Sequence, residues 1–226
     1  MNNLLHKCLS LTVCSVIALN HSFAQKHSVA FTTNPHTGAM STLTINGDAR
    51  NMNWLVATDG SQYPWIKEQY GWGLGYLTEK NGGDSTQYEW KTPAGIDQDG
   101  SVTYNAGTIQ IRVKRQLNNG ELTERYTFLN TGKNVAALSD IGIYTPLNDN
   151  YPDAVTCENS RTDVHIWEGE SAAYINAVRM SGFPPHLGLV VTKGSIDRYE
   201  IYEPVYRLCH FKKNNRPLCF SRSCSF

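Results

Sequence analysis

The stretch TIQIRVKRQLNNGELTERYTFL, residues 108–129, decides the fold class. In its first half, apolar side chains alternate with polar ones, at Ile109, Ile111 and Val113. A period of two residues is that of a β-strand with one buried face. Asn118-Asn119-Gly120 follows as a turn signal, because Asn and Gly tolerate the positive φ of a tight hairpin. The run Glu121 to Leu129 then returns along the first run, so we predict a β-hairpin here.

Short runs of the same kind recur along the chain, with Gly, Pro, Asn or Asp in nearly every gap. They are Val29 to Thr33, Ser41 to Ile45, Asn53 to Ala57, Gly73 to Leu77, Tyr88 to Thr92, Ser101 to Asn105, Ala136 to Tyr144, Val164 to Trp167, Ala173 to Met180, Leu187 to Thr192 and Tyr199 to Tyr202. We find no convincing long amphipathic helix and no internal repeat. The pattern predicts an all-β fold, a two-sheet antiparallel β-sandwich, with a closed barrel as the rival architecture.

The N-terminus has the order of a cleavable signal peptide. Lys7 precedes an apolar run from Cys8 to Leu19, which is too short to span a bilayer, and Ser22-Phe23-Ala24 supplies small residues before a cut. We expect residues 1–24 to be removed and the protein to be periplasmic or secreted. A lipoprotein cut before Cys14 is the alternative, and Val13 argues against it because that position requires a small residue.

Charge divides the rest of the chain into two regions. From Gln25 to Tyr206 there are 14 Lys and Arg against 20 Asp and Glu, a net charge of −6, whereas the remaining residues carry 5 basic and no acidic side chains. A mildly acidic body argues against nucleic acid or anionic lipid as a partner, because both require clustered Lys and Arg.

The sequence predicts a domain over residues 25–206 and an irregular tail over 207–226. The tail also gathers Cys209, Cys219 and Cys224 and loses the alternation of the body. A flexible natural tail is one explanation. A frameshift that replaced the frame of a longer protein is the one we favour. These cysteines with His210 match no zinc-finger spacing, so no metal site is predicted there.

Aromatic residues gather between positions 54 and 90. They are Trp54, Tyr63, Trp65, Tyr70, Trp72, Tyr76, Tyr88 and Trp90. Pro64 and nearby glycines indicate loops, and a ring on a loop can stack on the apolar C–H face of a sugar. The other interpretation is that these rings fill the core, because aromatic side chains supply much of the buried area of β proteins.

A second candidate group is the run Asp163 to Glu170. If it is a strand, Asp163, His165 and Trp167 share one face that could line a ligand groove. Glu168 and Glu170 do not suit glycoside hydrolysis, which requires two carboxylates facing each other across a sugar at about 5 to 10 Å. His186 stands before an apolar run and is either a second imidazole near His165 or a structural histidine.

The candidate carbohydrate-binding residues are therefore Trp54, Trp65, Tyr70, Trp72, Trp90, His165, Trp167 and His186. The common signatures of hydrolases and phosphate binders are absent. We predict no catalytic residue, no metal and no cofactor.

Several motifs together resemble a known family. They are Asn34-Pro35-His36-Thr37-Gly38, Met52-Asn53-Trp54, Asp140 to Asp149, His165-Ile166-Trp167 and Pro185 to Leu189. As a set they resemble the N-terminal β-sandwich of large secreted glycoside hydrolases of gut-type Bacteroidetes. The resemblance runs from about Val29 to Tyr202 and implies a galactose-mutarotase-like or supersandwich fold, followed in that family by an (α/α) toroid with the catalytic acids.

The toroid has no counterpart in this sequence, so the resemblance implies no catalytic residue here. We expect a truncated, non-catalytic sandwich of a secreted polysaccharide-degrading enzyme, whose partners are carbohydrate and the missing catalytic domain. An independent carbohydrate-binding module is the first alternative. A small mutarotase-type enzyme, with His165 and His186 as acid groups and a Glu as base, is the second.

Overall fold

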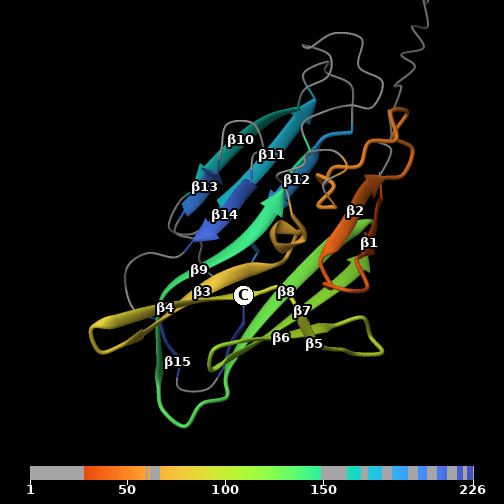
Figure 1. Cartoon of the computed structure of the whole chain (residues 1–226). Helices are drawn as coiled ribbons and strands as arrows, with labels where there is room; N and C mark the ends of the chain where they lie inside the picture. Colours follow the sequence, from red (N-terminus) through yellow and green to blue (C-terminus); the bar gives the residue numbers. More distant parts are fainter. Residues whose placement is uncertain are drawn as a thin grey trace, which may run out of the picture.

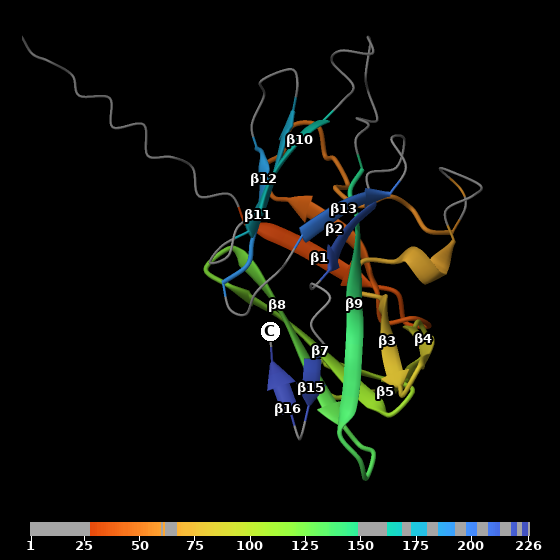
Figure 2. The same cartoon turned by 90° about the vertical axis from the view of Figure 1, so that its left-hand side faces the viewer.

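The structure is a computed structural model (Figures 1 and 2). It describes residues 28–59, 61, 67–148, 162–168, 173–179, 185–192, 198–202, 208–212, 218–220 and 223–225. For residues 162–168, 173, 179 and those beyond 192, only the backbone is described. The predicted signal peptide lies outside these residues. None of the described helices has the length and apolar character needed to cross a membrane.

The described strands form two large antiparallel sheets. The first has the order β13 (Arg198–Tyr202), β14 (Leu208–Lys212), β9 (Ala136–Pro146), β3 (Gly75–Asn81) and β4 (Asp84–Trp90), and β15 (Leu218–Phe220) also pairs with β9. The second has the order β16 (Ser223–Ser225), β8 (Glu121–Asn130), β7 (Ile109–Asn118), β6 (Val102–Ala106) and β5 (Pro93–Ile96). The two sheets remain separate and face each other, which confirms the predicted β-sandwich.

The predicted hairpin is β7–β8. Its pairing runs from Ile109 opposite Asn130 to Asn118 opposite Glu121, and the turn residues Asn119 and Gly120 have φ of 51° and 85°. The alternating apolar residues Ile109, Ile111 and Val113 are buried, as the pattern predicts.

A shared core lies between the two large sheets. Its main side chains are Leu74, Tyr76, Leu77, Trp90, Val102, Tyr104, Ile109, Ile111, Val113, Phe128 and Leu138. Trp90 meets Phe128 edge to face, with ring centroids 5.9 Å apart and an interplanar angle of 77°. Gly75 lets this indole approach the sheet, because a Cβ there would overlap both Trp90 and the backbone oxygen of Gly142.

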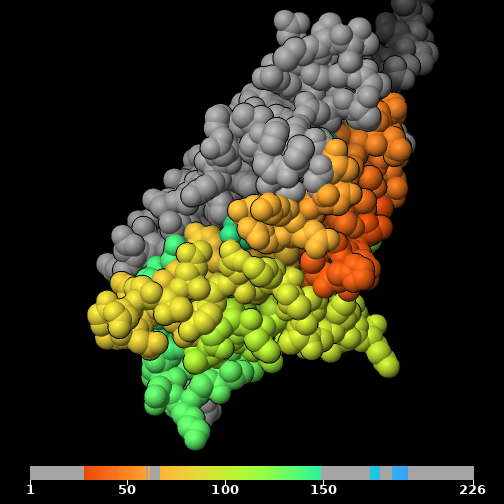
Figure 3. All heavy atoms as spheres, viewed as in Figure 1, coloured from red at the N-terminus to blue at the C-terminus, as the bar shows by residue number. Residues whose placement is uncertain are grey.

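Two smaller sheets enclose a second core. One is β1 (Val29–Thr33) with β2 (Met40–Ile45), and the other is β10 (Thr162–Glu168), β11 (Ala173–Arg179) and β12 (Leu187–Val190). The buried residues between them include Leu43, Met52, Trp54, Trp72, Leu147, Ile175, Ala177 and Leu187. The β10–β12 sheet lies above β3, β4 and β5 in Figures 1 and 2, near the level of β13. In the space-filling view, the N-terminal residues (orange) pack directly against the body formed by β3 to β8 (yellow to green) (Figure 3).

The described residues between 207 and 226, where an irregular tail was expected, lie in short strands, and the predicted domain boundary at 206 stays a prediction. β14 and β15 pair with β9, and β16 pairs with β8. Each partner lies far away in the sequence, so no local turn signal announces the pairing.

Candidate functional site

Three of the predicted sugar-binding tryptophans are core residues. Trp54, Trp72 and Trp90 are exposed by 0%, 3% and 1%. An indole enclosed in this way has no face open to a ligand, so the core interpretation replaces the binding one for these three. The indole N–H groups of two of them are hydrogen-bonded inside the fold: Trp72 Nε1 donates to Glu124 Oε2 at 2.6 Å and Trp90 Nε1 to the Gly73 oxygen at 3.1 Å.

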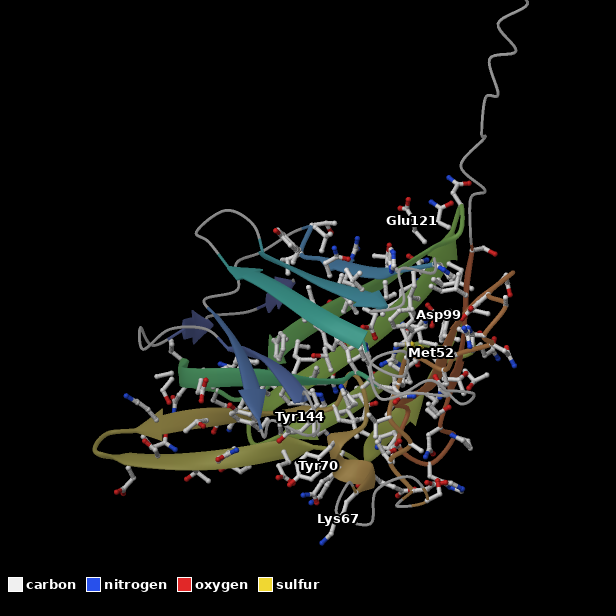
Figure 4. All side chains as sticks on the ribbon, turned by 90° about the horizontal axis from the view of Figure 1, so that it is seen from above. Met52, Lys67, Tyr70, Asp99, Glu121 and Tyr144 are labelled. Carbon is white, nitrogen blue, oxygen red and sulfur yellow. The ribbon has the colours of Figure 1, made fainter. Side chains whose placement is uncertain are left out.

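Trp65 lies outside the described residues, and Tyr70 ends the short 3₁₀ helix η1 (Glu68–Tyr70). The Tyr70 ring is half-buried and meets Tyr144 of β9 edge to face, with centroids 5.4 Å apart (Figure 4). Tyr70 therefore packs on the first large sheet. Its predicted role in sugar binding stays a prediction.

The structure brings the other predicted residues together on the β10–β12 sheet. The pairing of β10 with β11 sets His165 opposite Asn176 and Trp167 opposite Tyr174. Residues directly opposite in an antiparallel pair share one face of the sheet. His165 and Trp167 thus occupy the same face as Tyr174 and Asn176, as the alternation predicts.

The third strand completes this face. β12 sets Val190 opposite Tyr174 and Gly188 opposite Asn176. Tyr174 is 42% exposed and Val190 is 67% exposed, whereas Ile175 and Ala177 of the opposite face are fully buried. We call the exposed side the outer face. Its members, by register, are His165, Trp167, Tyr174, Asn176, Gly188 and Val190.

His186 extends the outer face at one end. It is exposed, and it precedes Gly188 by two residues, which is the spacing of same-face positions in an extended chain. His165 and His186 therefore occupy one face, two strands apart and offset by two residues along the strands, or roughly 12 Å at the usual strand spacing and rise. The sequence prediction omitted Tyr174 and Asn176, although their alternation with Ile175 and Ala177 was a readable signal.

Two rows of different chemistry cross the outer face. Trp167, Tyr174 and Val190 make an apolar row that contains two aromatic residues. His165, Asn176 and Gly188 make a neighbouring polar row with an opening at the glycine. Such a face offers ring stacking and hydrogen bonding side by side.

A buried ion pair links strands β7 and β8 to the backbone at Gly38 and Trp72. Arg115 Nε donates to Glu124 Oε1 at 2.6 Å, and its Nη1 donates to the Gly38 oxygen at 2.8 Å. Burial by itself lowers the pKa of Arg115, but the adjacent Glu124 carboxylate leaves that pKa raised overall. The pair joins backbone segments inside the protein, so it is structural rather than a binding site.

The motif residues Asn53 and Asn148 are also structural. The Asn53 side-chain oxygen accepts hydrogen bonds from the backbone N–H groups of Leu43 at 3.0 Å and Leu55 at 3.1 Å. Asn148 Nδ2 donates to the Asn53 backbone oxygen at 2.9 Å. Across the described residues, no three His, Cys, Asp or Glu side chains group as a metal site requires.

No protein-family model matches the sequence, and no curated protein matches it significantly. Among solved structures, a polysaccharide lyase matches with a TM-score of 0.79 and 47% sequence identity. The match covers 88% of this chain and 31% of the lyase, so the chain spans about a third of that protein's length.

Together, the fold and this likeness define a β-sandwich domain related to a carbohydrate-active enzyme. The particular relative is the polysaccharide lyase, and this chain is similar to one part of it. The predicted relationship to a polysaccharide-degrading protein is therefore confirmed. A glycoside-hydrolase parent and a specifically galactose-mutarotase-like fold stay predictions.

Proposed function

We propose that this chain is the β-sandwich portion of a polysaccharide-degrading enzyme, that it contacts the polysaccharide, and that it breaks no glycosidic bond by itself. The observation that carries the proposal is the 47% identity with a polysaccharide lyase over 88% of this chain. A sandwich that covers 31% of the lyase leaves most of that enzyme in other parts. In the proposal, those other parts carry out the cleavage.

The partners of the buried carboxylates support a non-catalytic role. Glu124 binds Arg115 and Trp72, and Glu79 accepts hydrogen bonds from the N–H and the hydroxyl of Thr108 at 2.9 and 2.6 Å. Both are committed to folding contacts. A general acid or base must instead lie within hydrogen-bond reach of a substrate proton.

The relative favours lyase chemistry over hydrolysis for the longer enzyme. A lyase breaks the glycosidic bond by elimination and leaves a carbon–carbon double bond at the new non-reducing end. A hydrolase adds water and leaves no double bond. Ultraviolet absorbance of the products therefore separates the lyase proposal from the glycoside-hydrolase prediction, while reducing ends form in both reactions.

The test uses the purified chain and a panel of neutral and acidic polysaccharides. We expect retardation in affinity gels that contain the bound polysaccharide, with no gain in ultraviolet absorbance or reducing ends. Absence of retardation across a broad panel would overturn the proposed contact. Product formation by the pure chain would overturn the non-catalytic role.

An independent carbohydrate-binding module is a second candidate, which the exposed outer face favours. The two candidates differ in what the neighbouring DNA encodes. The enzyme proposal expects the frame of a catalytic domain downstream, whereas the module requires none. The same DNA tests the frameshift prediction for residues 207–226.

We also propose that the protein is exported through its N-terminal signal. The basic start, the short apolar run and the small residues before position 25 support this proposal. Mass spectrometry of protein recovered from the periplasm or medium should show a chain that begins at Gln25. An intact N-terminus in a cytoplasmic protein would contradict export.

A further inference from the structure

We propose that the outer face of the β10–β12 sheet is a glycan-binding platform, on which an uncharged stretch of polysaccharide lies across the strands. This inference rests on the proposed function, because it names the surface that makes the carbohydrate contact. The observation behind it is the juxtaposition of an apolar row and a polar row on one exposed sheet face.

The exposure of the apolar row is the first step. Tyr174 is 42% exposed and stands directly opposite Val190, which is 67% exposed. Large apolar side chains that lie adjacent and exposed mark interaction sites more often than isolated ones do. The register adds Trp167 to the same row. A pyranose ring presents an apolar face of C–H groups that suits such a row.

The polar row lies two residues further along each strand, or about 7 Å. Asn176 is exposed there and offers an amide that can both donate and accept hydrogen bonds. Its cross-strand neighbours are His165 and Gly188. Hydroxyl groups at the rim of a stacked sugar would meet this row.

Charge selects the class of ligand. The described side chains of the outer face, with His186 at its end, are Tyr174, Asn176, His186 and Val190, and none is a carboxylate, a lysine or an arginine. Asp163, opposite Val178, stands at one end of the face. A polyanion finds no lysine or arginine among these side chains, whereas the hydroxyl and amide groups of Tyr174 and Asn176 suit a neutral sugar.

The outer face has free space for a side chain at Gly188. A Cβ at Gly188 would meet no atom of the described structure within 4 Å. A larger side chain there would therefore stand on the outer face without disturbing the fold, and it would occupy the space assigned to the glycan. This property permits a blocking substitution.

The experiment compares Gly188→Val with Gly95→Val. Gly95 on β5 is the matched control, because it is also an exposed strand glycine with open space around its Cβ position. Each purified variant is tested in affinity gels with the neutral polysaccharide that retards the wild-type chain, and its folding is checked by circular dichroism. We expect Gly188→Val to weaken binding by at least about tenfold, as when a central contact is lost, and Gly95→Val to bind as the wild type does.

Truncation of the apolar row gives a second, independent readout. Tyr174→Ala should weaken binding by about tenfold or more, whereas Leu117→Ala, a truncation at a side chain that is 49% exposed on β7, should leave it unchanged. Unchanged binding in folded Gly188→Val and Tyr174→Ala would overturn the platform while the chain still binds polysaccharide. The proposed function would then stand without this site.

The same variants also test two other occupants of the outer face, a second copy of the chain and a protein domain of the longer enzyme. If the outer face joins two copies of the chain, the wild type sediments as a dimer and Gly188→Val as a monomer. If a protein domain of the longer enzyme covers it, the variants lose that association and keep glycan binding. Either result overturns the platform.

Discussion

Arg115 on β7 and Glu124 on β8 are directly opposite each other in the sheet, and Arg115 Nε donates to Glu124 Oε1 at 2.6 Å. The second oxygen of the carboxylate accepts the Trp72 indole N–H at 2.6 Å. The guanidinium also donates to the backbone oxygens of Gly38 and Trp72. One ion pair thus joins the central hairpin to two separate loops.

Arg115→Met should destabilise the protein by about 3–5 kcal/mol, because it leaves the Glu124 carboxylate buried without its cation. Arg112→Met on the same strand is the control. Arg112 forms an exposed ion pair with Asp97 at 2.7 Å, and exposed pairs contribute about 0–1 kcal/mol. Urea denaturation measures both. Equal losses in the two variants would show that the buried pair adds nothing beyond a surface pair.

The raised pKa of Tyr104 predicts that the folded protein loses stability at alkaline pH. Burial raises the pKa of Tyr104 to about 12 from an ordinary value of 10.0, and its hydroxyl donates to the Thr37 oxygen at 2.8 Å. The folded state holds the Tyr104 proton more tightly than the unfolded state does. The stability that this proton contributes is therefore complete below pH 10 and is lost as the pH rises through about 12.

Tyr104→Phe should cost about 1–3 kcal/mol at pH 8, because the Thr37 carbonyl loses this donor. Its stability should then fall less than that of the wild type above pH 10. Part of the fall should persist, because burial also raises the pKa of Tyr126. Urea midpoints between pH 8 and pH 11 test this, and parallel curves for both proteins would contradict it.

A comparison of Gly38 with Gly82 distinguishes two reasons why a position requires glycine, namely its backbone conformation and its close packing. Both have positive φ, 69° and 63°, so alanine at either position should cost about 1 kcal/mol in backbone strain. A Cβ at Gly38 would also overlap Val102 and the Tyr104 hydroxyl, whereas one at Gly82 meets nothing within 4 Å. Gly38→Ala should therefore lose roughly 1–3 kcal/mol more than Gly82→Ala, the usual cost of overpacking. Thermal unfolding of the two variants measures the difference, and equal melting temperatures would remove the packing argument.

The elements that the sequence predicted correctly are those whose signals are local. The hairpin of β7 and β8 combines alternation with a turn at Asn119 and Gly120, all within about twenty residues. β14 lacks such a signal, because its register with β9 joins Leu208 to Pro146 across a long stretch of chain. Pairing between distant segments depends on the whole fold, so the pattern around residue 208 did not reveal it.

The candidate site was predictable where alternation alone decides which face a residue occupies. Asp163, His165 and Trp167 were placed on one face by their spacing, and the register agrees. For Trp54 and Trp90 the sequence left two interpretations, sugar binding and core, and their burial supports the core one. Which side of a sheet is enclosed depends on the second layer, and the sequence around a tryptophan does not contain that layer.

Substitutions of Asn53 test whether the motif Met52-Asn53-Trp54 serves folding or binding. Its side-chain oxygen accepts two backbone N–H groups, those of Leu43 and Leu55. Asn53→Leu should therefore cost about 2–4 kcal/mol, because two donors lose their acceptor. Asn53→Asp keeps the acceptor oxygen and should cost less. Both variants should retain glycan retardation wherever they remain folded, because Asn53 is not among the residues of the outer face. If a folded Asn53→Asp chain loses retardation while its urea midpoint stays near that of the wild type, the motif contributes to the ligand site and the structural assignment is wrong.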